Sequence, residues 1–84
     1  MHLEILTPEK KLFSENVYGV LLPGITGLFE VLEKHAPLVS ALKAGKLKIL
    51  KDKNTTETYE ITGGFVEMLN NKASVLIEGA TALD

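Results

Sequence analysis

Residues 65–78 read FVEMLNNKASVLIE, two apolar-rich segments separated by a pair of asparagines. In the second segment Val75 and Ile77 alternate with polar residues, and a period of two is typical of a strand with one buried face. Asparagine tolerates the left-handed backbone conformation that tight hairpin turns require. The stretch therefore predicts a β-hairpin that turns at Asn70-Asn71, and it favours an all-β fold for the rest of the chain.

The same alternation recurs elsewhere. Residues 47–62, LKILKDKNTTETYEIT, predict a second hairpin whose polar tip falls around residues 52–56. Segments 17–22 (VYGVLL) and 64–69 (GFVEML) are denser in apolar residues and are candidates for strands buried on both faces. Short strands separated by turn residues predict a β-sandwich or barrel, and 84 residues provide a single domain, residues 1–84. Apolar residues alternate with polar ones at Leu3 and Ile5, Leu47 and Ile49, and Tyr59 and Ile61.

One segment is ambiguous. PLVSALKAG, residues 37–45, has proline at its start and glycine just past its end, which is the usual asymmetry of a helix. It is only about two turns long, and Ala36 is a poor N-cap. The pattern alone therefore allows a short helix and an apolar strand equally.

Composition excludes several classes of protein. The chain has no cysteine, so disulfides and thiolate metal sites are excluded. All nine basic residues are lysines and the net charge is −2, whereas a nucleic-acid reader normally shows a basic, arginine-rich footprint. No apolar run approaches the ~18 residues that a membrane-spanning helix needs, so no direct membrane insertion is expected. The opening MHLEILTPEKK lacks the features of a signal peptide, and the protein is expected to act where it is made.

No constellation of residues indicates an active site or a cofactor. The segment LPGITG, residues 22–27, has two glycines but lacks the lysine and hydroxyl residue that complete a phosphate loop. His2 and His35 do not have the spacing of a helical metal pair. We therefore expect no catalytic residue, no metal and no cofactor.

Lys53, at the predicted hairpin tip, raises an alternative. Lipoyl and biotinyl carrier domains are also all-β, acidic and about this size, and they present a modified lysine at such a tip. Asp52, Lys53 and Asn54 equally suit an ordinary solvated turn, and the residue after Lys53 is not the small apolar one usual in carriers. A carrier domain modified at Lys53 is the second hypothesis, and an unrelated β-sandwich adaptor is the third.

Residues 21–42, LLPGITGLFEVLEKHAPLVSAL, decide between these hypotheses because they resemble a known pattern. The pattern is Leu-Pro-Gly, two residues, Gly, one residue, then Phe-Gly-Val-Leu-Pro-Gly-His-Ala-Pro-Leu-Val, and it belongs to the epsilon subunit of F-type ATP synthases. The opening MHLEILTPEKKLFSENV, the segment GKLKI and the final ETYEITGGFVEMLNNKASVLIEGA are also similar to that family, so the resemblance spans nearly the whole chain.

The resemblance implies a flattened β-sandwich of two five-stranded sheets, with residues 37–42 as a strand. It implies a non-catalytic rotor part that joins the gamma subunit of the central stalk to the polar loops of the membrane c-ring, with other subunits of the catalytic head as further partners. In a bacterium this place is the cytoplasmic face of the inner membrane, and the ring is driven by protons or sodium ions. Longer members carry a carboxy-terminal helical hairpin, so the chain is either a short form or a truncated one.

Three departures from the pattern bear on the partners. Glu30 stands where the family often has glycine, Glu33-Lys34 replaces a frequent Pro-Gly, and Leu28 replaces an acidic residue of some members. The segment from Pro23 to Lys34 is therefore expected to keep its shape but to meet a differently charged ring loop, with a less certain turn before His35.

By resemblance, two groups of residues are expected to contact partners. The predicted ring-contact loop comprises Gly24, Ile25, Thr26, Gly27, Leu28, Phe29, Glu30 and Glu33. The predicted gamma contact comprises His35, Ala36, Pro37 and Ser40.

Each of these groups also has a purely structural alternative. The apolar loop residues could tuck against the sandwich edge, and His35 could pack at a strand start and bond a neighbouring carbonyl. The lysines from Lys46 to Lys53 suit a solvated face or edge protection better than a phosphate site. Gly63-Gly64 is expected to serve the backbone, and Phe65 and Val66 to lie in the core.

Overall fold

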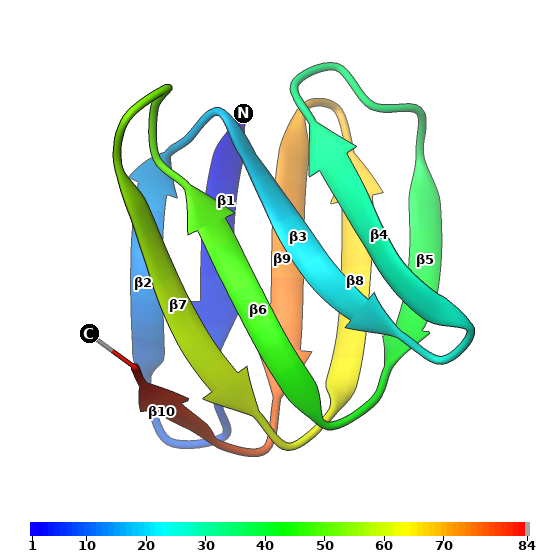
Figure 1. The fold of residues 1–84 in the computed structure, drawn as a ribbon. Coiled ribbons are helices and arrows are strands. Elements are labelled where there is room, and N and C mark those ends of the chain that lie inside the picture. The colour runs from blue at the N-terminus through cyan, green and yellow to red at the C-terminus, as the bar shows by residue number, and fades with distance from the viewer. Residues whose placement is uncertain (84) are drawn as a thin grey trace.

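Ten strands make up most of the protein in the computed structural model, which describes residues 1–83 (Figure 1). No helix occurs among these residues, and hence none that could cross a membrane. The strands are β1 (His2–Leu6), β2 (Lys11–Asn16), β3 (Gly19–Gly24), β4 (Gly27–Leu32), β5 (Leu38–Leu42), β6 (Gly45–Leu50), β7 (Thr56–Ile61), β8 (Gly64–Leu69), β9 (Lys72–Ile77) and β10 (Ala80–Ala82).

The strands form one continuous sheet that folds over itself into a two-layer sandwich (Figure 1). The front layer runs β10-β7-β6-β3-β4 and the back layer β5-β8-β9-β1-β2, with a single pairing of Gly24 with Leu42 joining β3 to β5. Each layer has five strands, so the predicted all-β sandwich of two five-stranded sheets is confirmed. Residues 38–42 are the strand β5, which confirms the strand implied by the resemblance over the helix.

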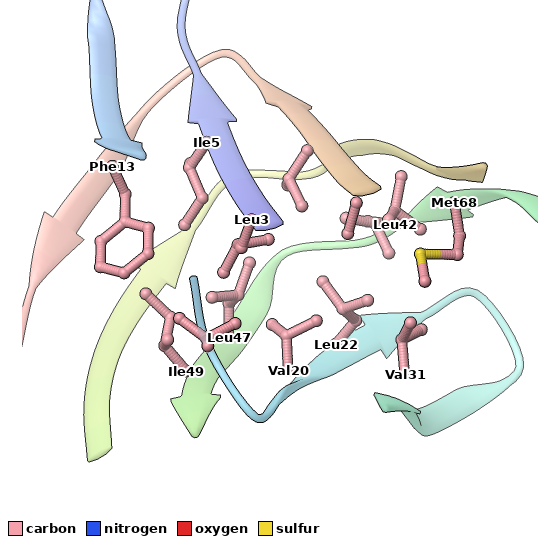
Figure 2. Close-up of a cluster of buried hydrophobic side chains, with 14 of the residues drawn as sticks. Leu3, Ile5, Phe13, Val20, Leu22, Val31, Leu42, Leu47, Ile49 and Met68 are labelled. Carbon is pink, nitrogen blue, oxygen red and sulfur yellow. The ribbon is translucent and has the colours of Figure 1, made fainter. Parts of the chain in front are cut away.

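The core lies between the two layers and consists of apolar side chains only (Figure 2). Leu3 and Ile5 of β1 face Leu47 and Ile49 of β6 across this space, and all four are almost completely buried. Burying a side chain of this size stabilises the fold by about 1.5–3 kcal/mol. The alternation in the sequence therefore gave the inward faces of these strands correctly.

The two segments that are richest in apolar residues differ in how they are buried. Strand β3 is buried along almost its whole length, as expected for most of residues 17–22, but Tyr18 of that segment precedes the strand and is 47% exposed. Strand β8 alternates instead, because Val66 and Met68 are buried whereas Phe65 is 58% exposed. The prediction that Phe65 lies in the core is wrong, and the prediction for Val66 is confirmed.

Both predicted hairpins form. Asn70 and Asn71 have φ angles of 52° and 60°, the left-handed values of a tight hairpin turn, between β8 and β9. Strands β6 and β7 pair from Gly45 to Ile61, and the Lys51 N–H closes their loop by donating to the Thr55 carbonyl over 2.9 Å. All neighbouring strands pair antiparallel except β1 and β9, which are parallel, and all run between the two ends of the sandwich (Figure 1). We call them the Gly64 end, where β8 begins, and the His35 end, where β4 is followed by β5.

Candidate docking surfaces

An exposed apolar turn lies at the Gly64 end. Gly24 pairs with Gly27, which leaves Ile25 and Thr26 as a two-residue turn between β3 and β4. Ile25 is 59% exposed and the following Leu28 is 72% exposed. We call Ile25, Thr26 and Leu28 the hairpin tip. The predicted loop is thus the turn of a hairpin, and its apolar side chains face solvent.

The other members of the predicted ring-contact loop are dispersed along β4. Phe29 is half-buried and packs against the core, as its structural alternative required. Glu30 is exposed and forms no ion pair within residues 1–83. Glu33 follows the far end of β4, about 20 Å along the strand from Gly27 at ~3.3 Å per residue. Its Oε1 lies 3.1 Å from the Met1 amino nitrogen, so the structure does not bring Glu33 to the tip.

The segment that links β4 to β5 turns sharply at Lys34. This residue has a φ of 62°, in the left-handed region that favours glycine. The Lys34 N–H donates to the Asn71 side-chain oxygen over 2.8 Å, and the His35 N–H donates to the Leu32 carbonyl over 3.1 Å. The turn that the loss of Pro-Gly made less certain is therefore present, and a side chain of the neighbouring hairpin supports it.

Three of the four predicted gamma-contact residues lie together. His35, Ala36 and Pro37 are consecutive and exposed, and the His35 Nδ1 is 2.8 Å from the Ala36 carbonyl oxygen. The structural alternative for His35 required a hydrogen bond to a neighbouring carbonyl, and this contact agrees with it. It also required a packed imidazole ring, and the exposed ring does not agree with that. Ser40 is half-buried on β5, and its hydroxyl lies 3.4 Å from the Ala41 carbonyl oxygen. Its neighbour Val39, rather than Ser40, is the exposed residue there, at 73%.

Sequence reasoning missed an apolar row across the outer face of the back layer. The strand registers place Ala41 opposite Phe65, Phe65 opposite Leu76, and Leu76 opposite Leu6. We call these four residues the outer row. Phe65 and Leu76 are 58% and 52% exposed, and with Pro8 they border a shallow hollow near the Gly64 end. A row of apolar side chains across four strands, over which no strand of residues 1–83 packs, is a surface suited to a partner.

The sequence did contain a signal for this row. Phe65 shares its face of β8 with Glu67, and Leu76 shares its face of β9 with Ser74. Since successive residues of a strand point to opposite faces, a charged residue two positions away places Phe65 outside. Because residues 64–69 are mostly apolar, their composition alone did not indicate this alternation of inward and outward side chains.

Charged residues lie beyond the outer row, on the same strands β1 and β9 and on the adjacent β2. Glu4 is within 3.3 Å of the Lys11 ammonium and 3.5 Å of the Lys72 ammonium. The hydrogen bond from Lys11 is the largest cause that lowers the pKa of the Glu4 carboxyl below its ordinary value, and Lys72 adds to it. The outer face therefore changes from apolar to charged along the strands, away from the Gly64 end.

The lysines of residues 46–53 do not form one cluster. Lys46, Lys48 and Lys53 are exposed, as predicted for a solvated face. Lys51 is half-buried, and its ammonium lies 2.8 Å from Glu57 and 3.5 Å from Glu15 on β2. The hydrogen bond that Lys51 donates to Glu57 is the largest cause that raises the pKa of Lys51. Lys51 thus connects the two layers of the sandwich at the edge that is remote from β4 and β5.

Nothing among residues 1–83 gathers three histidine, cysteine, aspartate or glutamate side chains as a metal site would. Lys53 lies in the exposed loop between β6 and β7, where the Asp52 carboxylate accepts a hydrogen bond from the Asn54 N–H over 2.8 Å. A hydrogen bond of this kind is usual in solvated turns, which are the structural alternative to a carrier domain modified at Lys53.

Comparison with known proteins places the chain in a family. Residues 1–82 match the family model described as ATP synthase, Delta/Epsilon chain, beta-sandwich domain. The chain belongs to this ATP synthase delta/epsilon family. The ATP synthase epsilon chain of Chlorobaculum tepidum is 46% identical over 76 residues, which cover 90% of this chain and 86% of that protein. The epsilon chain of Protochlamydia amoebophila is 42% identical over 90% of this chain but only 52% of its own length.

Solved structures show the same fold. A chain of the Euglena gracilis mitochondrial ATP synthase, in an assembly of OSCP, F1 and c-ring, superposes with a TM-score of 0.91 at 22% identity. The match covers 96% of this chain and 52% of that one. A chain of the Tetrahymena thermophila central stalk and c-ring gives a TM-score of 0.82 at 19% identity. Because the chain belongs to the delta/epsilon family, the exposed position of Lys53 is explained by an ordinary solvated turn and does not support the carrier hypothesis.

Proposed function

We propose that this delta/epsilon chain is a non-catalytic subunit of the central stalk, which joins the gamma subunit to the c-ring and supports rotational coupling of ion transport to ATP synthesis. The observation that carries the proposal is the family match over residues 1–82, combined with two exposed apolar surfaces at one end of the sandwich. The coupling ion would be a proton or a sodium ion. The complex would place the chain on the cytoplasmic face of a bacterial inner membrane.

The two apolar surfaces suit two different partners. The outer row is broad and lies on the regular face of a five-stranded layer, so we assign it to the gamma subunit. The hairpin tip is small and projects from the edge of the other layer, so we assign it to the polar loops of the ring. Apolar and aromatic side chains at the centre of a protein interface usually contribute most of its affinity.

His35, Ala36 and Pro37 are the second part of the proposed gamma contact. They lie at the opposite end of β5 from Ala41, about 13 Å along the strand from Pro37 at ~3.3 Å per residue. A gamma subunit that lies along β5 could contact both regions. His35→Ala is expected to weaken gamma binding without removing a hydrolytic activity from this subunit, and an unchanged affinity would exclude His35 from the contact.

Two substitutions test the assignment as a pair. Phe65→Lys places a charge in the outer row, and Ile25→Lys places one at the hairpin tip, and both positions are already exposed. Phe65→Lys should prevent co-purification with the gamma subunit of the same source, whereas Ile25→Lys should not. Ile25→Lys should instead reduce ATP-driven ion pumping of the assembled enzyme while its ATP hydrolysis persists. Equal effects of both substitutions on gamma binding would refute the assignment of separate surfaces.

A crosslink provides an independent check of the ring contact. A cysteine introduced at Leu28 is the only thiol of the chain, because the protein has no cysteine of its own. In the assembled enzyme its crosslinker should reach the c subunit. If only the gamma subunit is labelled from position 28, the tip belongs to the gamma contact.

A further inference from the structure

Strand β4 has an open edge. It pairs with β3 along one side, from Gly27 to Leu32, and no strand among residues 1–83 pairs with its other side (Figure 1). An open edge presents unpaired N–H and C=O groups to solvent and is a template for another strand.

The register shows which backbone groups of β4 are free. The Pro23 carbonyl accepts a hydrogen bond from the Lys43 N–H over 2.9 Å, so it points away from β4. Opposite residues of an antiparallel pair exchange either both of their hydrogen bonds or neither, so the pair of Pro23 and Leu28 exchanges none. The N–H and C=O of Leu28 therefore face the open edge, and those of Glu30, two positions on, face the same way. Leu32 follows them, but its carbonyl already accepts from the His35 N–H.

The terminal strands β10 and β2 carry the usual protection against pairing, and β4 does not. The edge of β5 beyond the pair of Leu42 with Gly24 is open as well, but a proline stands immediately before that strand. Strand β10 has only three residues. Strand β2 has an irregular register with β1 near Lys11, and its Glu15 is bonded to Lys51. Along β4 there is no proline, no lysine and no irregularity in the pairing with β3. An edge without these devices is a surface for strand addition.

A groove runs beside this edge. It lies between β4 and β5, has a volume of about 330 Å³, and is bordered by Leu28, Phe29, Leu38, Val39 and Ser40. One face of an added strand would meet Phe29 and Leu38 in the groove, both of which are half-buried against the core. The opposite face would lie beside Leu28 and the unpaired carboxylate of Glu30.

We propose that the open edge of β4 binds an extended segment of a partner polypeptide as an added strand, with apolar residues on one face and lysine or arginine on the other. The free groups of Leu28 and Glu30 supply the main-chain bonds, the groove takes the apolar side chains, and Glu30 selects the basic ones. A second copy of this chain suits the edge less well, because it would bring further carboxylates to a protein that is already negatively charged. The inference extends the proposed ring contact from the hairpin tip along β4, and in that respect rests on the proposed function.

The test uses the isolated chain and two synthetic peptides with blocked ends, one alternating lysine with valine and the other glutamate with valine. Backbone NMR reports the amides of individual residues. The lysine peptide should shift the Leu28 and Glu30 amides and slow their hydrogen exchange, and the glutamate peptide should bind at least tenfold more weakly. Equal binding of both peptides, or shifts confined to other strands, would overturn the proposal. Chains already paired through β4 in sedimentation, with these amides protected before peptide is added, would make a second copy the occupant and overturn it as well.

A matched pair of variants isolates the main-chain bond. Leu28→Pro removes the outward N–H and leaves the pairing with β3 intact, since proline is tolerated at edge positions whose N–H faces away from the sheet. Leu28→Ala removes the same side chain and keeps the N–H. Leu28→Pro should bind the lysine peptide about five- to tenfold more weakly than Leu28→Ala, the factor of about one hydrogen bond. Equal affinities of two folded variants would overturn the proposal, and the amide measurements on the unmodified chain decide it if Leu28→Pro does not fold. None of these results depends on the gamma complex, so failure here is distinguishable from failure of the proposed function.

Discussion

Replacing Gly64 by alanine should be among the most damaging single changes in the protein. Gly64 begins β8, at the point where this strand pairs with both β5 and β9. Its φ is 150°, a value that residues with a side chain rarely adopt, and an added Cβ would overlap the Leu76 carbonyl oxygen. A backbone oxygen in a paired strand cannot turn aside as a side chain would, so the pairing of β8 with β9 must shift.

The expected loss of stability on Gly64→Ala is the sum of a backbone cost and a packing cost. An alanine in such a backbone region costs about 1–3 kcal/mol, and overpacking costs a further 1–3 kcal/mol or so. We therefore expect Gly64→Ala to lower the free energy of unfolding by about 4 kcal/mol. At ~0.05–0.15 kcal/mol per residue, a domain of this length has a total of roughly 4–13 kcal/mol. The substitution removes a large share of it and can prevent folding.

Alanine substitutions at two further glycines distinguish the backbone cost from the packing cost. Gly27 has a φ of 139° but nothing within 4 Å of an added Cβ, so Gly27→Ala carries the backbone term alone, about 1–3 kcal/mol. Gly79 has neither feature, and Gly79→Ala should change stability by less than about 1 kcal/mol. Urea unfolding followed by far-ultraviolet circular dichroism measures all three. A loss for Gly64→Ala within 1 kcal/mol of that for Gly27→Ala would refute the overlap with Leu76.

Three other predictions concern single side chains. Lys34→Gly should stabilise the fold by about 0.5–1 kcal/mol, seen as a higher Tm, because glycine relieves the left-handed conformation at a smaller entropic cost. The lowered pKa of Glu4 gives stability that is present above the ordinary carboxyl pKa and lost as the pH falls. Glu4→Gln should therefore lose less stability than the unmodified protein between about pH 6 and 3, and equal acid losses would exclude the bonds from Lys11 and Lys72. His35→Ala and Phe65→Lys should weaken gamma binding additively, since residues more than about 10 Å apart rarely couple. A double variant that is no worse than Phe65→Lys alone would contradict this.

Most of the strands could be predicted because their local signals agree. The polar and apolar residues alternate around Leu3 and Leu47, and Asn70-Asn71 provides the turn that the flanking strands require. Segment 37–45 could not be assigned from its own residues, because its apolar positions fit the period of a helix as well as that of a strand. Its pairing with β8, between Leu38 and Leu42, is a long-range contact that no local pattern contains, and only the family resemblance indicated that this segment is a strand.

The candidate surfaces were less predictable than the fold. The segment treated as one loop contains the six-residue strand β4, and a strand of that length separates Ile25 from Glu33 by most of the height of the sandwich. The outer row depends on which face of β8 and β9 is covered. Phe65 and Val66 are adjacent and both apolar, so composition could not tell which of them points inward. Glu67 is charged and lies two positions from Phe65, so these two side chains share the solvent-facing side of β8. Its position indicates the outward face of the strand better than the adjacent apolar residues do.

The position of these surfaces constrains how the subunit can work. The outer row and the hairpin tip belong to different layers, but both lie toward the Gly64 end, where Gly24 of β3 pairs with Leu42 of β5. Partners on the two surfaces would therefore meet near the one point where the layers are joined by backbone pairing. A torque applied between them would pass through this junction and through the closely packed core, which has few ways to deform. The small sandwich is thus suited to act as a stiff coupling between two partners, and this role requires no catalytic group.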